Sequence, residues 1–169
     1  MAQTRRFLPK VTVGEILRML PQSTRHQYAA GTVILKEGTR ADSCFLLLSG
    51  GVQISKRMKI RTVTNLAMMK KGDFFGEMAM LSGQPRSATA TALSDVKALE
   101  IKRTDFLRLL EKQDPLAARL ALHFSSALAL RCSRVLQLLA KNPGERAADS
   151  KQAVDVRKVL HRVYSLWAV

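Results

Sequence analysis

The sequence predicts an α+β domain in which a many-stranded antiparallel sheet, curled into a sandwich, barrel or roll, is flanked by helices. From Tyr28 to Ile101, short runs rich in Val, Ile, Leu, Phe and Thr alternate with regularly spaced glycines, which supply the positive φ of tight turns. Outside this stretch, apolar residues recur at helical spacing. A chain of 169 residues, 47% of them hydrophobic, can bury one core.

A leading helix is expected first, with an apolar stripe that stops at Pro21. The stripe consists of Val13, Ile16, Leu17 and Leu20. The strands are expected at Thr32 to Lys36, Cys44 to Leu48, Val52 to Lys56, Arg61 to Met68, Ala88 to Leu93 and Val96 to Ile101. A helix-forming run, Glu77 to Leu81, interrupts this strand pattern.

Three helices are expected after the last strand. Thr104-Asp105 opens the first, and Asp114-Pro115 caps a longer one that ends at Asn142-Pro143-Gly144. The apolar stripe of the longer helix is suited to packing or to a dimer surface, so monomer and homodimer both stay open. A last amphipathic helix, over 149–169, has Tyr164 and Trp167 on its apolar face.

The charge balance favours anionic partners, because 28 Lys and Arg against 13 Asp and Glu leave a net charge of +15. It does not choose among nucleic acid, lipid headgroups, acidic proteins and phosphorylated metabolites. The two cysteines, Cys44 and Cys132, lie far apart without zinc or disulfide spacing. No apolar stretch approaches the roughly 18 residues of a membrane span. We therefore expect a soluble cytoplasmic protein without a bound metal.

The stretch from Phe75 to Thr89 contains the residues that indicate a ligand-binding site. Gly76 lets the backbone approach a ligand, and the short helix beginning near Glu77 presents unpaired N–H groups that suit a phosphate. After the Gly83-Gln84-Pro85 turn, Arg86 can offer a planar fork of donors to phosphate oxygens. Glu77 is an acceptor at neutral pH, so its natural partner is a hydroxyl of the same ligand, such as a ribose 2′-OH. Taken in isolation, Glu77 and Arg86 are also compatible with a structural ion pair.

This stretch resembles the phosphate-binding cassette of cyclic nucleotide-binding domains. The family pattern is Phe-Gly-Glu-(Leu/Met)-Ala-Leu, a short turn, and Pro-Arg-(Ser/Thr/Ala)-Ala-Thr, and the chain matches it without insertion or deletion. The resemblance covers about residues 13 to 141. Upstream, it includes the family's β-roll turns at Tyr28 to Gly31, Lys36 to Gly38, Ala41-Asp42 and Phe45 to Gly50.

The resemblance implies an antiparallel β-roll, which is a double-stranded β-helix of jelly-roll type, with an N-terminal helix, a short cassette helix and C-terminal helices. It divides the chain into an N-terminal helical segment (1–27), the cyclic nucleotide-binding β-roll with its following helices (28–141), and a C-terminal amphipathic helix (142–169). The implied ligand is cAMP or cGMP, and no other cofactor is expected.

When the family's residue roles are transferred to the matching positions, the resemblance implies that Arg86 binds the cyclic phosphate and Glu77 binds the ribose 2′-OH. The backbone N–H groups of the turn complete the cradle, and the hydroxyl of Ser87 can touch the phosphate or a guanine edge, which leaves the choice of base open. The expected ligand-binding residues are Gly76, Glu77, Met78, Ala79, Arg86 and Ser87. Tyr164 and Trp167 are a possible base cap on a lid helix, and plain packing of that helix is the alternative.

We expect no enzyme activity, since no nucleophile, metal cluster or paired carboxylate accompanies the cassette. The 30 residues after Leu139 are too few for a three-helix DNA-binding head. The chain therefore resembles a stand-alone receptor that signals to an unidentified protein partner through its C-terminal helices, and sequence-specific DNA binding is not expected. The alternatives are a regulator of the catabolite activator type lacking its own head, or a regulatory fragment or subunit of a cyclic nucleotide-gated channel.

Overall fold

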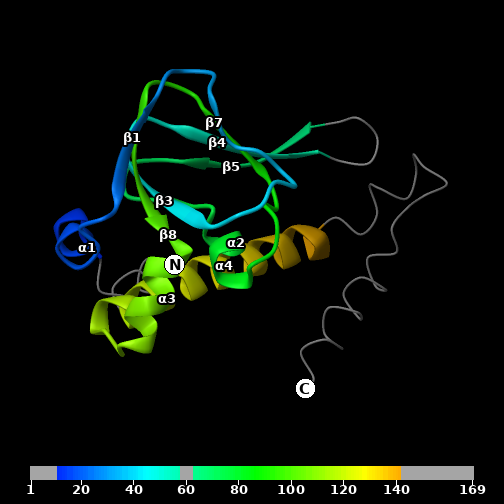
Figure 1. Ribbon diagram of the computed structural model, residues 1–169. Helices are drawn as coiled ribbons and strands as arrows, with labels where there is room; N and C mark the ends of the chain where they lie inside the picture. The colour runs from blue at the N-terminus through cyan, green and yellow to red at the C-terminus, as the bar shows by residue number, and fades with distance from the viewer. Residues whose placement is uncertain (1–10, 58–62, 142–169) are drawn as a thin grey trace, which may run out of the picture. The chain divides into compact units, whose positions relative to one another are not determined.

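The computed structural model describes residues 11–57 and 63–141 (Figure 1). The chain divides into one unit that ends at Phe124 and another that begins at Ser125. In chain order, the helices and strands are α1 (Val13–Met19), β1 (Thr24–Tyr28), β2 (Val33–Leu35), β3 (Ser43–Ser49), β4 (Val52–Arg57), β5 (Val63–Met69), β6 (Phe74–Phe75), α2 (Glu77–Ser82), β7 (Thr89–Ala92), β8 (Val96–Lys102), α3 (Arg103–Glu111) and α4 (Pro115–Lys141).

The strands form two four-stranded antiparallel sheets, in the orders β1-β8-β3-β6 and β2-β7-β4-β5 (Figure 1). This arrangement confirms the expected antiparallel β-roll. Each of the six expected strands overlaps an observed one, while β1 and the two-residue β6 were not expected. The short helix α2 occupies the place of the helix-forming run within the strand region.

The first sheet separates two hydrophobic cores. Successive strand side chains point to opposite faces, so Cys44 and Leu46 of β3 join a cluster with the helices. Phe45 and Leu47 join a second cluster in the interior of the roll. This two-sided burial explains why β3 is continuously apolar from Cys44 to Leu48 and does not alternate. In β6 the same alternation places Phe74 in the helix-side core and Phe75 in the roll core.

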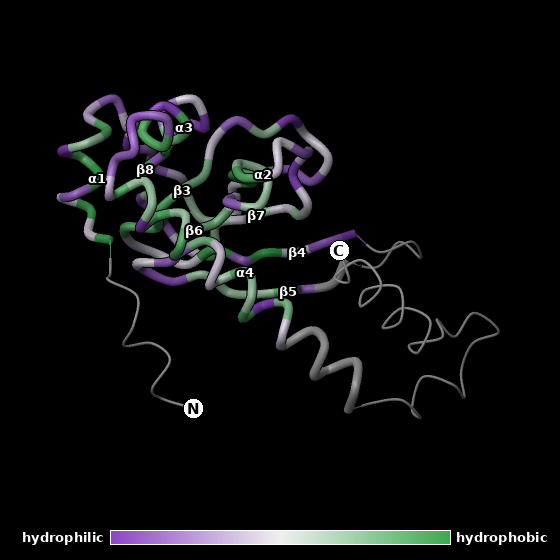
Figure 2. Tube along the Cα trace, turned by 90° about the horizontal axis from the view of Figure 1, so that it is seen from below, coloured by the Kyte–Doolittle hydropathy of each residue, from purple (hydrophilic) through white to green (hydrophobic). Residues whose placement is uncertain are grey.

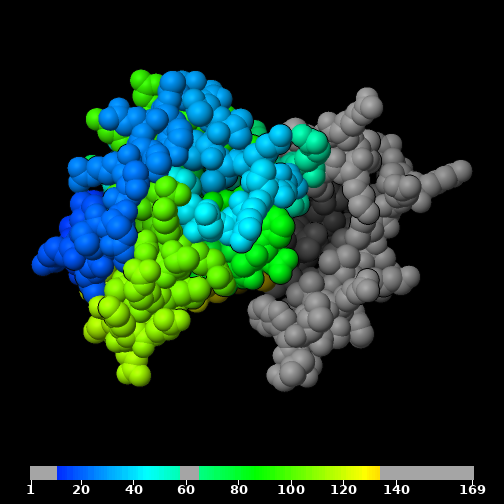
Figure 3. All heavy atoms as spheres, viewed as in Figure 1, coloured from blue at the N-terminus to red at the C-terminus, as the bar shows by residue number. Residues whose placement is uncertain are grey.

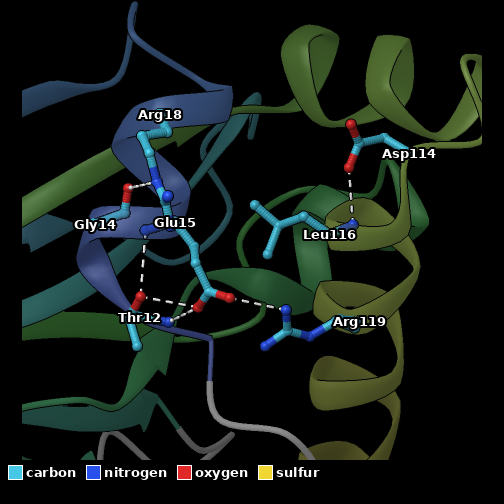
Figure 4. Close-up of polar contacts among 7 residues, drawn as sticks. All are labelled: Thr12, Gly14, Glu15, Arg18, Asp114, Leu116 and Arg119. Carbon is cyan, nitrogen blue, oxygen red and sulfur yellow. Dashed lines mark hydrogen bonds and ion pairs between the residues drawn. The ribbon is translucent and has the colours of Figure 1, made fainter.

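The helix-side core packs α1, α3 and the start of α4 against the first sheet, through Ile16, Leu20, Phe106, Leu116, Ala117, Leu120 and Phe124. A capping box begins α1 (Figure 4). The Oγ1 atom of Thr12 accepts a hydrogen bond from the backbone N–H of Glu15 at 3.2 Å. In return, the carboxylate of Glu15 accepts from the N–H of Thr12 at 2.8 Å.

The start of α4 is capped as the sequence indicates. Oδ1 of Asp114 accepts a hydrogen bond from the N–H of Leu116 at 2.8 Å (Figure 4). Pro115 occupies the first helical position. The helix continues to Lys141, directly before the expected break at Asn142. The expected last helix, with Tyr164 and Trp167, lies outside the described residues. Within the described part of the chain, no helix is both long and apolar enough to cross a membrane.

Candidate ligand-binding site

A glycine stands on each side of α2. Gly76 follows β6 with φ +79°, and Gly83 ends the helix with φ +70°. Both values lie in the left-handed region that glycine adopts without steric cost. These two residues let the chain leave β6, form a helix of only six residues and turn back toward β7.

Close packing also requires glycine at position 76. A Cβ atom there would lie 2.7 Å from Nη1 of Arg86 and 3.0 Å from Cδ1 of Leu35. The backbone of Gly76 therefore lies directly against the guanidinium of Arg86. The cassette glycine and the cassette arginine, ten residues apart, form one packed unit.

The side chain of Arg86 is buried, with 6% of the residue exposed. Its Nη1 donates to the carbonyl oxygens of Ser43 at 2.5 Å and Gly76 at 3.0 Å, and its Nη2 donates to Oγ of Ser43 at 3.2 Å. A guanidinium carries five N–H donors, more than these three contacts use. Burial lowers the pKa of Arg86, and nearby carboxylates, Asp42 foremost, act in the opposite direction.

The main chain of Arg86 is fixed as well. Its N–H donates to the carbonyl of Thr39 at 2.9 Å, and its own carbonyl accepts from the N–H of Gly38 at 2.8 Å. Figure 3 shows the α2 region (green) at the surface beside the residues near position 40 (cyan). The loop between β2 and β3 therefore sets the position of Arg86.

Glu77 begins α2 and is 2% exposed. The residue directly before it, Gly76, accepts a hydrogen bond from Nη1 of Arg86 at 3.0 Å. The negative charge of Glu77 adds to the rise in the pKa of Cys44. Cys44 is fully buried, and burial is the main cause of its raised pKa, so its thiol remains protonated and unreactive. The structure thus places Arg86, one of the two charged residues that the sequence singles out, against the backbone that directly precedes the other, Glu77.

The other expected site residues divide between core and surface. Ala79 is buried, whereas Met78 is 46% exposed and Ser87 is exposed. Oγ of Ser87 donates to Sδ of Met78 at 3.6 Å, so these two side chains meet at the surface of the cassette. Tyr164 and Trp167 fall outside the described residues.

Two residues near the cassette were not predicted from the sequence. Ser43 holds the guanidinium of Arg86, and Lys56 donates from its ammonium group to the carbonyl of Ser87 at 2.6 Å. Neither belongs to the cassette motif. Across the described residues, no group of three His, Cys, Asp or Glu side chains could hold a metal ion.

A two-sheet antiparallel roll, with a buried arginine and a buried glutamate gathered around a glycine-bounded helix, defines a ligand-binding module. The family model described as "Cyclic nucleotide-binding domain" matches residues 25–113. The chain belongs to this family, which is a family of regulatory domains.

One curated relative is a protein kinase, and another is a protein kinase regulatory subunit. The chain is 38% identical over 86 residues to "cGMP-dependent protein kinase, isozyme 1" of Drosophila melanogaster, covering 49% of this chain and 11% of that protein. It is 32% identical over 113 residues to the "cAMP-dependent protein kinase regulatory subunit" of Pyricularia oryzae, covering 67% of this chain and 28% of that protein. The chain therefore spans less than a third of the length of either relative.

Among solved structures, a cyclic nucleotide-binding domain from Methylobacillus flagellatus has the same fold, with a TM-score of 0.70. The match covers 80% of this chain and 76% of that chain at 24% identity.

Proposed function

We propose that this domain binds cAMP or cGMP at the cassette and acts as a regulatory receptor. The guanidinium of Arg86 binds the cyclic phosphate, and the carboxylate of Glu77 accepts the ribose 2′-OH. Backbone N–H groups between Gly76 and Ala79 complete the phosphate contacts, and the hydroxyl of Ser87 faces the phosphate or the base.

The buried guanidinium of Arg86 carries this proposal. A cation is costly to bury unless it has hydrogen-bond partners and opposite charge. The Arg86 side chain is held between the carbonyls of Ser43 and Gly76, and it retains donors beyond those three contacts. A phosphate suits the planar fork of donors, and a bound anion adds the opposite charge that favours burial.

Packing between the residues before the cassette and α4 supports a signalling role. Phe74 lies two residues before Gly76 and packs against Phe124 of α4, with ring centroids 5.1 Å apart. A change in the cassette can therefore alter the packing of α4 at Phe124, and in this way the domain would signal to an as yet unidentified protein partner. The proposal treats the domain as a stand-alone receptor, either monomeric or homodimeric.

Calorimetric titration with both nucleotides, after removal of carried-over ligand, tests the binding site. Losing one partner of a buried charge pair costs about 3–5 kcal/mol, so Arg86→Ala should weaken affinity about a hundredfold or more. Glu77→Ala should cost less, because a hydrogen bond to a charged group contributes about 1.5–3 kcal/mol. Arg25→Ala, at an exposed position in β1, is the matched control and should bind as the parent does. Parent-like binding by both cassette variants overturns the proposal, as does a parent protein that binds neither nucleotide.

The aromatic cap has its own test. If Tyr164 or Trp167 covers the base, saturating nucleotide should change the fluorescence of Trp167, the chain's only tryptophan. Deletion after Gly144 should also weaken affinity while the β-roll stays folded. An unchanged fluorescence spectrum together with unchanged affinity in the deletion removes the cap from the proposal.

A further inference from the structure

We propose that Lys56, held in place by Glu37, is a positioning residue for the segment that carries Arg86 and Ser87. This inference rests on the proposed nucleotide site and adds a residue outside the cassette motif. Lys56 lies near the end of β4. In Figure 2, β4 changes from hydrophobic (green) to hydrophilic (purple) toward that end. Its ammonium group donates to the carbonyl of Ser87 at 2.6 Å and to Oε1 of Glu37 at 3.1 Å.

Glu37 is fixed at both carboxylate oxygens. While Oε1 accepts from Lys56, Oε2 accepts from the backbone N–H of Arg57 at 3.0 Å. The N–H of Glu37 in turn donates to Oγ1 of Thr89, the first residue of β7, at 3.1 Å. The hydrogen bonds from Arg57, the larger cause, and from Lys56 lower the pKa of Glu37, so the carboxylate is ionised at neutral pH. The ammonium of Lys56 is thereby held in one place and is not merely solvated.

The segment that Lys56 contacts lies before the regular ladder of β7. Its position is set on one side by the pair of backbone hydrogen bonds that join Arg86 to Gly38 and Thr39. The bond from Lys56 to Ser87 adds a third support, one residue farther along. All three supports come from the β2–β3 loop and the end of β4, so these two elements hold the arginine against Gly76.

The contact with Lys56 also orients the next peptide group. A trans peptide is planar, so its carbonyl and its N–H point in opposite directions. With the carbonyl of Ser87 held toward Lys56, the N–H of Ala88 faces the other way. Lys56 thus sets the direction of a backbone donor two residues from Arg86.

A plain surface ion pair is the competing explanation. The side chains of Lys56 and Glu37 are 42% and 28% exposed, and exposed ion pairs contribute little to stability. An ion pair alone predicts no effect on nucleotide affinity, whereas positioning of Ser87 predicts a specific effect. The two explanations therefore predict different nucleotide affinities and different local protection from hydrogen exchange, but the same overall stability.

Binding measurements on four variants separate the two explanations. Lys56→Met keeps the aliphatic stem and removes the donor, so we expect affinity for cAMP and cGMP to fall about five- to tenfold. Glu37→Gln, which loosens Lys56 without removing it, should weaken binding about two- to fivefold. Lys56→Arg restores a donor and should stay within about twofold of the parent. Lys97→Met removes the same charge from an exposed position in β8 and should also match the parent.

Hydrogen exchange in the ligand-free protein gives a second readout. In Lys56→Met, the backbone amide of Arg86 should exchange faster, while amides of β8 keep the parent rate. Unchanged nucleotide affinity in Lys56→Met, in a series where Arg86→Ala loses binding, overturns the positioning role and leaves the proposed function standing. If Lys56→Met does not fold, nucleotide affinity equal to that of the parent in Glu37→Gln overturns the positioning role in the same way. A parent protein that binds neither nucleotide overturns both proposals.

Discussion

Nη1 of Arg119 in α4 lies 2.8 Å from Oε1 of Glu15 in α1 (Figure 4). The other oxygen of the same carboxylate accepts the N–H and the hydroxyl of Thr12 in the capping box. Glu15 therefore both caps the N-terminus of α1 and joins α1 to α4, through a residue more than a hundred positions later in the chain. The pair ties α1 to the helix that follows the roll.

This relationship predicts an acid-dependent loss of stability. The capping N–H of Thr12, followed by Arg119, lowers the pKa of Glu15 from 4.5 to about 2. Because the folded pKa lies below the unfolded one, the stabilisation is present above about pH 4.5 and is lost as pH falls toward 2. Glu15→Gln should therefore melt below the parent at pH 7, and the gap should close at acid pH. Thermal unfolding between pH 7 and pH 2.5 measures this.

The control for Glu15 is Glu111→Gln, which changes an exposed glutamate in α3. Its melting temperature should follow that of the parent at neutral pH. A gap between parent and Glu15→Gln that stays constant down to pH 2.5 would contradict the assigned role of the carboxylate.

Substitution of Gly76 by alanine should damage both stability and binding. The left-handed backbone alone makes Ala cost about 1–3 kcal/mol, and here the added Cβ also meets the guanidinium of Arg86. Gly72→Ala isolates the backbone effect, since Gly72 has φ +90° with nothing within 4 Å of a Cβ. Urea unfolding should show the larger loss in Gly76→Ala, and calorimetry should show reduced nucleotide affinity in that variant alone. Equal unfolding free energies in the two variants would refute the close-packing argument.

Two leucines on α4 should respond differently to truncation. Leu120 is fully buried in the helix-side core, so Leu120→Ala should lose about 2–5 kcal/mol of unfolding free energy. Leu122 is 56% exposed, and Leu122→Ala should stay within about 0.5 kcal/mol of the parent. Denaturant titration of both variants checks the prediction. Comparable losses would mean that α4 packs on the sheet through a different face.

The net charge of +15 should produce weak, nonspecific attraction to polyanions. In a gel-shift titration, duplex DNA binding should be indifferent to sequence and should decline steeply as salt rises from about 50 to 200 mM. A sequence preference that survives physiological ionic strength would contradict this expectation and would favour a DNA-associated regulator.

The sequence prediction missed two strands, β1 because it is polar and β6 because it has only two residues. β1, which reads Thr-Arg-His-Gln-Tyr, pairs only with β8 at the edge of the sheet and leaves most of its side chains exposed. A polar edge strand has no alternating apolar pattern to recognise. Likewise, the two residues of β6 are too few for periodicity, and only pairing with β3 defines them as a strand.

The cassette residues were recognisable from local sequence because glycine, glutamate and arginine stand close together at a defined spacing. The supports of Arg86 were not, since Ser43 lies 43 residues before it. Lys56 contacts Ser87 across 31 residues. Such contacts arise only when the roll brings β3, β4 and the cassette side by side, and no local pattern encodes them.

Phe74 and Phe75 give the two cores a shared boundary. The ring of Phe74 meets Phe124 edge-on in the helix-side core, and the ring of Phe75 stacks on Phe45 in the roll core, with centroids 5.1 and 5.4 Å apart. Because these neighbours share one peptide unit directly before Gly76, neither core can loosen at this point without disturbing the other. The helix-side core and the roll core should therefore unfold in one cooperative transition, and the ligand cassette should unfold with them.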